Sequence, residues 1–413
     1  MSGGKISITL DIANVEVLSV TVSERGYEIG VESTLDGTHC QRCGRKIKAF
    51  HGYNEPVEVR HLPILGQAVY ITYRPKRYAC PYCAGKPTTT QQVTWHTAGS
   101  SMTKAYERSV LKALIHSTVQ DVSQKEALSY DSVLGVMERC VADQVVWSRF
   151  QRLDVLGIDE LAVKKGQRDY VVIVTTRNAV GELALLGVLP NREQATVQAF
   201  LDSIPPDLKA TIHSVCVDMY VPYHQAIHAA LPHAAIVIDR FHVVKHYMHA
   251  ADAVRQQVMK DLKKKLPKAD YAALKGVHLA FRQHWTDLSS ADQRLLDLLF
   301  HHAPRLVLVY DFREALFRLF EKPSAPAQAA DDLKIWMFLV REQRIPGFDA
   351  FIDTLQNHWD GILNFFARRL TSGFVEGLNT KIRVLTRRSF GLFNLHHFFQ
   401  RLWLDLEGYR TLA

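Results

Sequence analysis

The chain has 413 residues, of which 47% are hydrophobic and 22% charged, so its composition is that of a globular protein with little disorder. The 50 Lys and Arg exceed the 42 Asp and Glu, which gives a formal net charge of +8. This charge is compatible with a polyanionic partner, but it is too modest to establish one. The length predicts several domains and a sizeable buried core.

The N-terminal residues lack the apolar core of a signal peptide, and no stretch approaches the length of a membrane span. We therefore expect a cytoplasmic protein. In that compartment the six cysteines stay reduced.

The N-terminal region combines strand-like alternation with two cysteine pairs. Residues 7–31 alternate apolar and polar side chains as a β-hairpin does. Cys40 and Cys43 form one CxxC pair, and Cys80 and Cys83 form another. Because each CxxC turn points both sulfurs at one ion, the pairs predict a closed, structural Zn²⁺ site with thiolate ligands.

The interval between the pairs is long, and we expect a β insertion there, over Val57–Leu62 and Ala68–Tyr73. Cys140 and Cys216 have no such partner and are predicted to be small buried side chains. Basic residues of this region could lie along DNA phosphates or simply form a solvated face. They are Arg42, Arg45, Lys46, Lys48, Arg74, Lys76 and Arg77.

Helical periodicity begins after Ser101. It predicts helices over residues 103–116, 118–128 and 132–145, the last with Asp131 as its N-cap. A supporting helix followed by two short helices and a tight turn is typical of a helix-turn-helix, although any three-helix bundle gives the same pattern.

The next region contains apolar runs that lead into acids. A first predicted strand, Val155–Glu160, carries Asp159, and two later strands precede Asp218 and Asp239. The five expected strands are Val155–Glu160, Tyr170–Thr176, Leu183–Leu189, Ile212–Val217 and Ala235–Ile238. Each aspartate alone could be a turn or helix-cap residue. Together they predict a site at one edge of a sheet, where metal ions can neutralise the acids.

The order of these elements predicts an α/β, ribonuclease-H-like fold. Its first three strands are antiparallel, and the fourth pairs beside the first. This topology places Asp159 and Asp218 on neighbouring central strands, with Asp239 one strand further out. Oxygen ligands of this kind suit Mg²⁺, and a pair of such ions can promote in-line displacement at a phosphodiester.

A long helical region follows, to about residue 370, with a loop expected at Pro323–Ala330. The lysines between residues 260 and 268 are expected to form a solvated helix face. Its aromatic residues are predicted to lie in a core. They are Trp285, Trp336, Phe338, Trp359, Phe365 and Phe366.

The C-terminal stretch predicts a helix that starts after Ser372. Spacings of three and four residues put Glu376, Asn379 and Arg383 on one face of this helix. Lys381 lies in the same helix, and Arg387 and Arg388 follow it. An aromatic-rich helix over Phe393–Leu404 is expected to close the chain.

These motifs together resemble the ISL-three family of bacterial insertion-sequence transposases. The resemblance covers nearly the whole chain, in the family's order of zinc finger, helix-turn-helix and DDE domain interrupted by a helical insertion. The matching segments are the CxxC pairs, Gly157-Ile158-Asp159-Glu160, Asp218 followed by Tyr223, Asp239-Arg240-Phe241-His242-Val243-Val244-Lys245 and Glu376-Gly377-Leu378-Asn379-x-Lys381-Ile382.

The resemblance implies a DDE-type transposase whose acidic triad falls on Asp159, Asp218 and Glu376. Asp239 is the alternative second acid, and strand order favours Asp218. The implied cofactors are Mg²⁺ or Mn²⁺ at the triad and Zn²⁺ at the cysteines. The implied partners are double-stranded DNA, at terminal inverted repeats and at the target, and a second copy of the chain. DNA contacts are expected from Arg42, Arg45, Lys46, Arg74, Arg77, Asn379, Lys381, Arg383, Arg387 and Arg388.

The expected domains are a hairpin and zinc finger at 1–95, a helix-turn-helix at 100–150, and a catalytic domain at 151–250 and 369–413 with a helical insertion at 251–368. Two other functions compete with transposition. A structure-selective nuclease of the same fold would not need the finger and helix-turn-helix. An inactive, transposase-derived DNA-binding regulator would tend to lose acids from the triad, and all three candidates are present.

Overall fold

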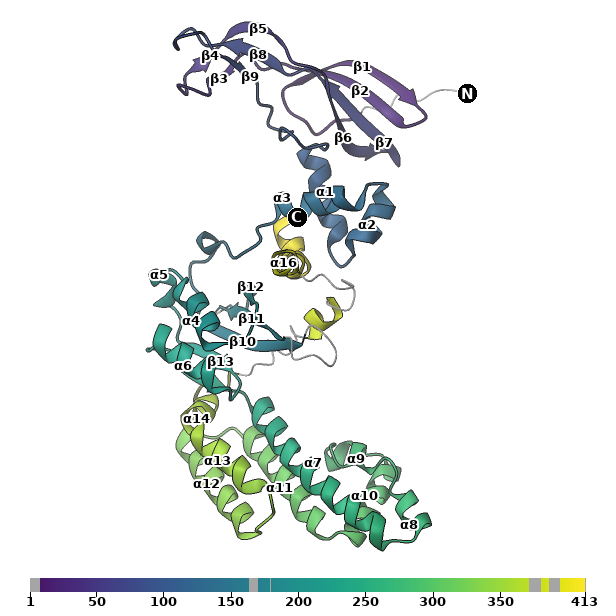
Figure 1. Cartoon of the computed structure of the whole chain (residues 1–413), viewed down its shortest axis with the longest axis vertical. Coiled ribbons are helices and arrows are strands. Elements are labelled where there is room, and N and C mark those ends of the chain that lie inside the picture. Colours follow the sequence, from purple (N-terminus) through teal and green to yellow (C-terminus); the bar gives the residue numbers. More distant parts are fainter. Residues whose placement is uncertain (1–7, 163–169, 179, 371–379, 386–393, 413) are drawn as a thin grey trace. The chain divides into compact units, whose positions relative to one another are not determined.

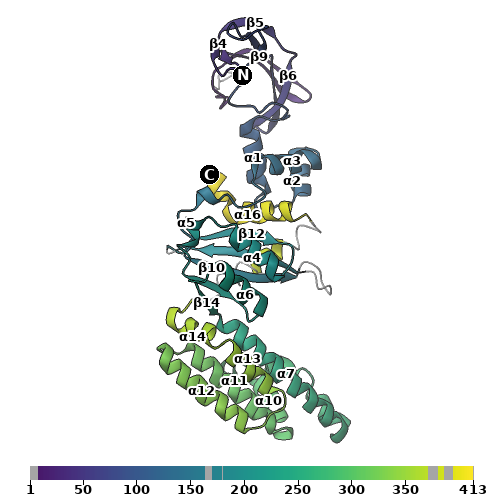
Figure 2. The same ribbon diagram turned by 60° about the vertical axis from the view of Figure 1, so that its left-hand side comes forward.

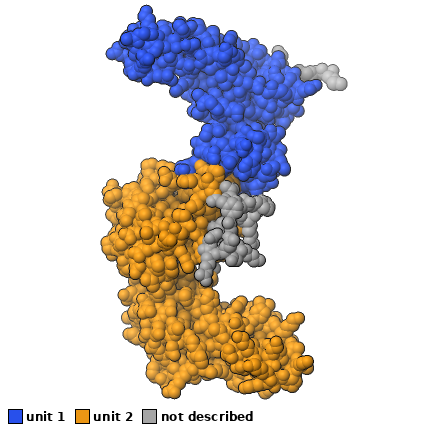
Figure 3. Space-filling model, viewed as in Figure 1, with its two compact units in different colours: residues 1–143, 403–413 blue, residues 144–402 orange. Residues whose placement is uncertain are grey.

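The structure is a computed structural model that describes residues 8–162, 170–178, 180–370, 380–385 and 394–412. The chain divides into two compact units, coloured separately in Figure 3. Unit 1 comprises Met1–Asp143 and Trp403–Ala413, and unit 2 comprises Gln144–Leu402. Ser372, Glu376, Asn379, Arg387 and Arg388 lie outside the described residues.

Unit 1 begins with a β-rich region (Figure 1). Its strands are β1 (Val15–Ser23), β2 (Gly26–Ser33), β3 (Thr38–His39), β4 (Lys46–Ile47), β5 (Ala49–Tyr53), β6 (Val57–Ile64), β7 (Gln67–Tyr73), β8 (Lys76–Ala79) and β9 (Thr88–Thr90). One sheet of unit 1 has four strands in the order β1-β2-β7-β6, which confirms the predicted hairpin and β insertion. Inward-facing residues such as Ile29, Val69 and Ile71 form its core, as alternation along strands requires.

Three short helices follow in unit 1: α1 (Lys104–Leu114), α2 (Val119–Glu126) and α3 (Tyr130–Cys140). The prediction that Asp131 caps α3 is wrong. Ser129 is the N-cap, and its hydroxyl accepts a hydrogen bond from the Ser132 amide at 3.1 Å. Asp131 instead lies in the first turn, where a carboxylate still favours the helix dipole. Cys140, predicted to be buried, is exposed because it lies on the last, solvent-facing turn of α3.

The closing helix is longer than predicted and extends over α16 (Leu395–Leu412). Its unit 1 part packs against the end of α1. Asp405 accepts a hydrogen bond from the His116 amide at 2.9 Å. A Cβ on Gly408 would lie 2.9 Å from Ile115 Cδ1, so the glycine lets the helix approach Ile115 closely.

Unit 2 is built on a five-stranded sheet of order β12-β11-β10-β13-β14 (Figure 2). The strands are β10 (Val155–Ala162), β11 (Tyr170–Arg177), β12 (Leu183–Leu189), β13 (Ser214–Val217) and β14 (Ala235–Ile238). β10 pairs antiparallel with β11 and parallel with β13. The predicted topology, with the fourth strand beside the first, is confirmed.

Side-chain alternation gives this sheet two different faces. On one face, Leu156 and Val215 share a core with the helices α4 (Gln194–Asp202) and α6 (Val221–Ala230). On the other face, Val155 and Cys216 belong to the core of the helical region that follows β14. Cys216 is therefore a small buried side chain, as predicted.

The remaining helices of unit 2 are mostly in the helical insertion. They are η1 (Trp147–Arg149) and α5 (Pro206–Lys209) around the sheet, then α7 (Arg240–Lys265), α8 (Lys268–Ala273), α9 (Val277–Ala280), η2 (Trp285–Asp287), α10 (Ser290–His302), α11 (Arg305–Glu321), α12 (Pro326–Glu342), α13 (Phe348–Asn357) and α14 (Trp359–Arg368). Residues 380–385 are also helical. Among the described residues, no helix is long and apolar enough to span a membrane.

Two predictions for the insertion need correction. The loop expected at Pro323–Ala330 is shorter, because Pro326 occupies the first turn of α12, where proline is favourable. Trp336, Phe365 and Phe366 are buried as predicted, but Phe338 and Trp285 are exposed. Phe338 lies outside the buried stripe of α12, which follows the helical period.

α14 covers the outer edge of the sheet. Asn364 Nδ2 donates a hydrogen bond to the Ile236 carbonyl at 2.8 Å, which satisfies a polar group on the edge strand β14. A Cβ on Gly361 would lie 2.8 Å from Ile238 Cδ1. The helix therefore lies close against the strand that precedes Asp239.

Candidate active site

The register of the parallel strands aligns the candidate aspartates. β10 pairs with β13 from Val155 opposite Ser214 to Gly157 opposite Cys216. Continuing this register by two residues brings Asp159 opposite Asp218. The β13–β14 register ends with Val217 opposite Ile238, so the next residue pair is Asp218 and Asp239. The three acids therefore form a row across neighbouring strands: Asp159 lies within β10, and Asp218 and Asp239 directly follow the ends of β13 and β14.

The three aspartates differ in accessibility. Asp159 and Asp218 are partly exposed, whereas Asp239 is only 3% exposed. Asp239 is the N-cap of α7, and its Oδ1 accepts a hydrogen bond from the Phe241 amide at 3.2 Å. It therefore performs the helix-cap role that a turn aspartate often has.

The electrostatics also couple Asp159 with Asp218. Burial raises the pKa of Asp159, and the nearby charges of Lys245 and Arg383 oppose this rise. Burial also raises the pKa of Asp218, His242 opposes this rise, and the charges of Glu160 and Asp159 add to it. A cation bound between the two carboxylates would offset the repulsion that Asp159 exerts on the ionised form of Asp218.

The donor set fits a hard divalent cation, since the carboxylates of Asp159 and Asp218 offer oxygen ligands. Both are held at fixed positions by local bonds. Asp159 Oδ1 accepts from the Glu160 amide at 2.8 Å, and Asp218 Oδ1 accepts from the Tyr220 amide at 3.0 Å. Arg383, in the helical residues 380–385, is close enough to Asp159 to affect its pKa. Residues 380–385, which follow the helical insertion in sequence, therefore place a positive charge near Asp159.

Sequence reasoning did not assign a role to a polar network beside this row. Tyr223 Oη donates to Glu160 Oε1 at 3.0 Å, and Arg192 Nη1 lies 3.3 Å from Glu160 Oε2. Strand alternation could have indicated part of it, because Glu160 must face away from Asp159. Arg192 carries no comparable signal in the sequence.

The cysteines of the two CxxC pairs converge in unit 1. The sulfurs of Cys40, Cys43, Cys80 and Cys83 all lie within 4.8 Å of one another, and those of Cys43 and Cys80 are 3.7 Å apart. Tetrahedral Zn–S bonds of about 2.3 Å require sulfurs roughly 3.8 Å apart, so the cluster fits zinc. Gly44, which follows Cys43, has a positive φ of 68°, a conformation that glycine adopts without steric cost.

Hydrogen bonds at the cluster shift the pKa values of two of these thiols in opposite directions. The Cys43 backbone amide is the main cause that lowers the pKa of Cys40, to about 6. The hydrogen bond with the Cys43 thiol is the main cause that raises the pKa of Cys83, to about 12. The lowered pKa favours the thiolate form of Cys40, whereas zinc would have to displace the proton of Cys83 on binding.

The basic residues of the finger fall into two groups. The side chains of Arg42, Arg45, Lys46 and Arg74 are exposed. Arg77 is half-buried, and its guanidinium donates to Thr88 Oγ1 at 2.8 Å, so it also has a structural bond. Lys381 and Arg383 are exposed in the C-terminal helical residues.

Family models match nearly the whole chain in three consecutive parts. Residues 36–83 match a zinc-finger of transposase IS204/IS1001/IS1096/IS1165, and residues 91–141 match the helix-turn-helix domain of transposase family ISL3. Residues 156–402, more than half of the chain, match the ISL3 DDE transposase domain. The chain belongs to the ISL3 transposase family. The transposase thus combines a zinc finger and a helix-turn-helix domain with a DDE catalytic domain.

Curated relatives of this transposase match over almost their full length. The transposase for insertion sequence element IS1001 of Bordetella parapertussis is 27% identical, covering 93% of this chain and 92% of the relative. The transposase for IS1557 of Mycobacterium tuberculosis is 25% identical, covering 90% and 86%. A Drosophila P element transposase in a strand transfer complex has 12% identity and a TM-score of 0.41, covering 77% of this chain and 94% of that one.

These findings confirm the predicted identity of the protein as a DDE-type insertion-sequence transposase with a ribonuclease-H-like catalytic domain. The cysteine cluster agrees with a structural zinc ion, and the DDE domain with a divalent metal cofactor. The helix-turn-helix domain agrees with DNA binding.

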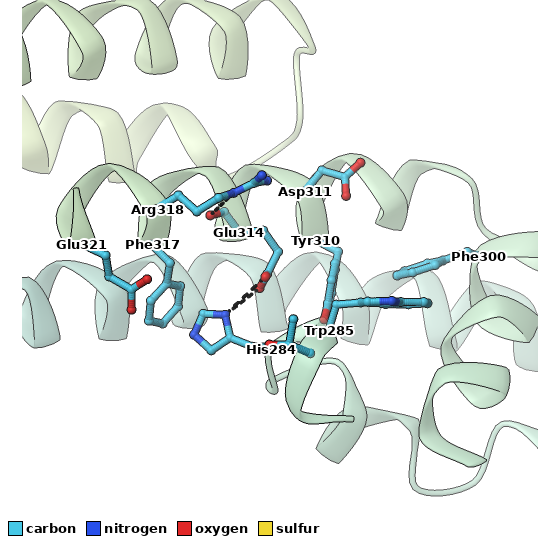
Figure 4. Close-up of a pocket in the computed structure, with 10 residues that line it drawn as sticks. His284, Trp285, Phe300, Tyr310, Asp311, Glu314, Phe317, Arg318 and Glu321 are labelled. Carbon is cyan, nitrogen blue, oxygen red and sulfur yellow. Dashed lines mark hydrogen bonds and ion pairs between the residues drawn. The ribbon is translucent and has the colours of Figure 1, made fainter. Parts of the chain in front are cut away.

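The transposase also has a pocket in its helical insertion, far in sequence from the aspartate row (Figure 4). One face of α11 forms a wall, with Tyr310, Glu314 and Phe317, and the segment before η2 contributes His284. His284 Nδ1 lies 3.2 Å from a Glu314 carboxylate oxygen. Three acids line the pocket with a single arginine, Arg318, so its charge does not suit a DNA phosphate.

Proposed function

We propose that this transposase cleaves and joins DNA with Asp159, Asp218 and Glu376 as its catalytic acids. The alignment of Asp159 with Asp218 across parallel strands carries the proposal, because it brings two partly exposed carboxylates to adjacent positions. Glu376 lies outside the described residues. Its assignment is supported by the family motif and by Arg383, seven residues later, whose charge acts on Asp159.

The three acids would hold Mg²⁺, for which Mn²⁺ can substitute. Bound there, the ions would activate the attacking oxygen and stabilise the leaving oxygen at the scissile phosphodiester. The protein contributes fixed carboxylates and nearby positive charge. Lys245 and Arg383 are exposed cations beside Asp159, and they can attract and orient the phosphate.

The reaction then needs no covalent intermediate with the protein. Water would first attack the phosphodiester at the end of the element, and the bond to the 3′-oxygen would break to give a 3′-hydroxyl. That hydroxyl would attack a phosphodiester of the target, form a new bond to phosphorus and expel the target's own 3′-oxygen. The first step hydrolyses a phosphodiester to a 3′-hydroxyl and a terminal phosphate, and the second exchanges one phosphodiester bond for another.

The finger and helix-turn-helix would recognise the terminal inverted repeats. Exposed cations of the finger would contact phosphates, while α3 would enter a groove as the recognition helix. Asn379, Lys381, Arg383, Arg387 and Arg388 would position DNA at the catalytic acids. Joining two ends of one element requires two active sites, so a homodimer on DNA is proposed.

A cleavage assay on DNA with the element's own terminal sequences tests this function. The wild-type protein should nick the terminal repeat only when Mg²⁺ or Mn²⁺ is added, and a pre-cleaved end should join to target DNA. Asp159→Asn should abolish both reactions while it still binds the repeat. Cleavage by Asp159→Asn at the wild-type rate would refute the assignment.

A further inference from the structure

The strand pairing alone does not determine the separation of Asp159 and Asp218. The last paired residues of β10 and β13 are Gly157 and Cys216, two residues before each aspartate. β13 itself ends at Val217. Because a separation error of about 1 Å is costly at a catalytic site, other contacts must fix the chain beyond the last pair.

The Glu160 network supplies such contacts on the opposite face of the sheet. Glu160 directly follows Asp159, and its side chain points toward α6, which follows Asp218. Tyr223, on the first turn of α6, is completely buried and donates its hydroxyl proton to Glu160 Oε1 at 3.0 Å. This bond links the residue after one aspartate to the helix after the other.

Arg192, between β12 and α4, also contacts Glu160. Its Nη1 lies 3.3 Å from Glu160 Oε2 and 3.4 Å from Oε1. Its guanidinium carbon lies 4.8 Å from the ring centre of Tyr220 and 5.2 Å from that of Tyr170. Stacking on Tyr220 matters here because the Tyr220 amide donates to Asp218 Oδ1 at 3.0 Å.

The turn after Asp218 is also held at its carbonyl. His224 Nε2 donates to the Asp218 carbonyl at 2.9 Å. The rings of Tyr220 and Tyr223 pack edge to face with centres 5.0 Å apart. The segment from Asp218 to His224 is therefore held by several internal contacts, and the Tyr223–Glu160 bond links it to β10 beyond the last strand pair.

We propose that Glu160, Tyr223 and Arg192 are positioning residues that set the spacing of Asp159 and Asp218, and through it the affinity for the divalent cation. This inference rests on the proposed role of the two aspartates. Glu160 acts through its hydrogen bonds and touches neither the metal nor the DNA. Its two carboxylate oxygens already accept bonds from Tyr223 and Arg192.

Binding of Mn²⁺ to the full-length, zinc-loaded protein, followed by electron paramagnetic resonance, tests the proposal without relying on activity. Tyr223→Phe removes only the hydroxyl that reaches Glu160. It should weaken Mn²⁺ binding roughly 10-fold, the loss typical of a residue that orients a ligand. Raising the Mn²⁺ concentration should restore most of the cleavage rate.

Tyr247→Phe is the matched control. Tyr247 is also completely buried, and its hydroxyl donates to the Val309 carbonyl at 2.6 Å inside the helical insertion. The two variants should lose similar stability in thermal unfolding, but Tyr247→Phe should keep the wild-type Mn²⁺ affinity. Equal Mn²⁺ affinities for Tyr223→Phe and Tyr247→Phe would overturn the proposal.

Glu160→Gln separates positioning from direct ligation. If Glu160 only positions, its effect on Mn²⁺ affinity should match that of Tyr223→Phe, and the double variant should be no worse than either single one. A much larger loss in Glu160→Gln than in Tyr223→Phe would make Glu160 a ligand and overturn the inference. The proposed function fails by a different result, namely unchanged Mn²⁺ affinity in both Asp159→Asn and Asp218→Asn.

Discussion

The cysteine cluster and the aspartate row are both metal sites by their chemistry, but they are assembled in opposite ways. The cysteines come from two tight turns, and their four sulfurs lie within 4.8 Å of one another. The aspartates come from separate strands, and the third proposed acid, Glu376, follows the helical insertion. A structural site can depend on local turns, whereas the catalytic site depends on the tertiary fold.

This comparison predicts that the catalytic site is the more sensitive to a change in a single ligand. Glu376→Gln keeps the shape of the side chain but removes its negative charge. Cleavage and strand transfer should fall on the order of 10³-fold, because metal-ion stabilisation is worth several kcal/mol. Binding to the terminal repeat, measured by gel shift, should be unchanged or tighter, since repulsion of the phosphate is relieved.

Glu376 could instead act only as a helix-terminus residue that stabilises its helix by about 1 kcal/mol. In that case Glu376→Gln would retain metal-dependent cleavage and lose only a little in melting temperature. That result would remove Glu376 from the site.

Removal of residues 1–150 should separate recognition from chemistry. The truncated protein should lose roughly 10³-fold or more of its preference for the terminal repeat over unrelated DNA, which is the range for specific recognition. Competition binding at fixed salt measures this ratio. Equal selectivity of the truncated and full-length proteins would show that the finger and helix-turn-helix do not read the ends.

Loss of a zinc ligand should have a smaller, local effect. Cys80→Ser should lower the zinc content measured in the purified protein and unfold the finger, while the sheet of unit 2 remains folded. Repeat binding should weaken, and limited proteolysis should cut first between residues 36 and 83. Freshly purified wild-type protein without zinc would contradict the assignment of the cysteines.

The smallest expected effect belongs to single phosphate contacts of the finger. Arg42→Ala should weaken binding to all DNA sequences alike and reduce the slope of log affinity against log salt by about one unit. Arg77→Ala is the informative comparison, because Arg77 also bonds Thr88 and its loss should lower stability as well. If Arg42→Ala instead changed which DNA sequences the protein prefers, Arg42 would contact bases rather than phosphates.

Patterns that depend on neighbours in sequence were predicted well. The apolar runs gave the strands of the sheet, with Leu183–Leu189 and Ala235–Ile238 found at the expected bounds. The two CxxC pairs predicted one four-cysteine site, and the four sulfurs lie within 4.8 Å of one another. The order of strands was enough to bring Asp159 and Asp218 to adjacent positions.

Features that depend on three-dimensional contacts were not predictable in the same way. They include the choice between two possible N-caps, the burial of one aromatic side chain and a contact between distant residues. Ser129 and Asp131 can both cap a helix, and the hydrogen bond to Ser132 decides for Ser129. Phe338 was assigned to the core for its aromatic character, but its place on α12 leaves it 63% exposed. Arg192 reaches Glu160 across 32 residues, and no spacing rule indicates such a contact.

The central claim is that Asp218, rather than Asp239, is the second catalytic acid. The most direct measurement compares Mg²⁺-dependent cleavage of the terminal repeat by Asp218→Asn and Asp239→Asn, with both proteins shown to be folded and to bind DNA. We predict that Asp218→Asn is inactive, and that Asp239→Asn retains cleavage with lower thermal stability, because Asp239 is the buried cap of α7. An active Asp218→Asn together with a folded but inactive Asp239→Asn would contradict this account.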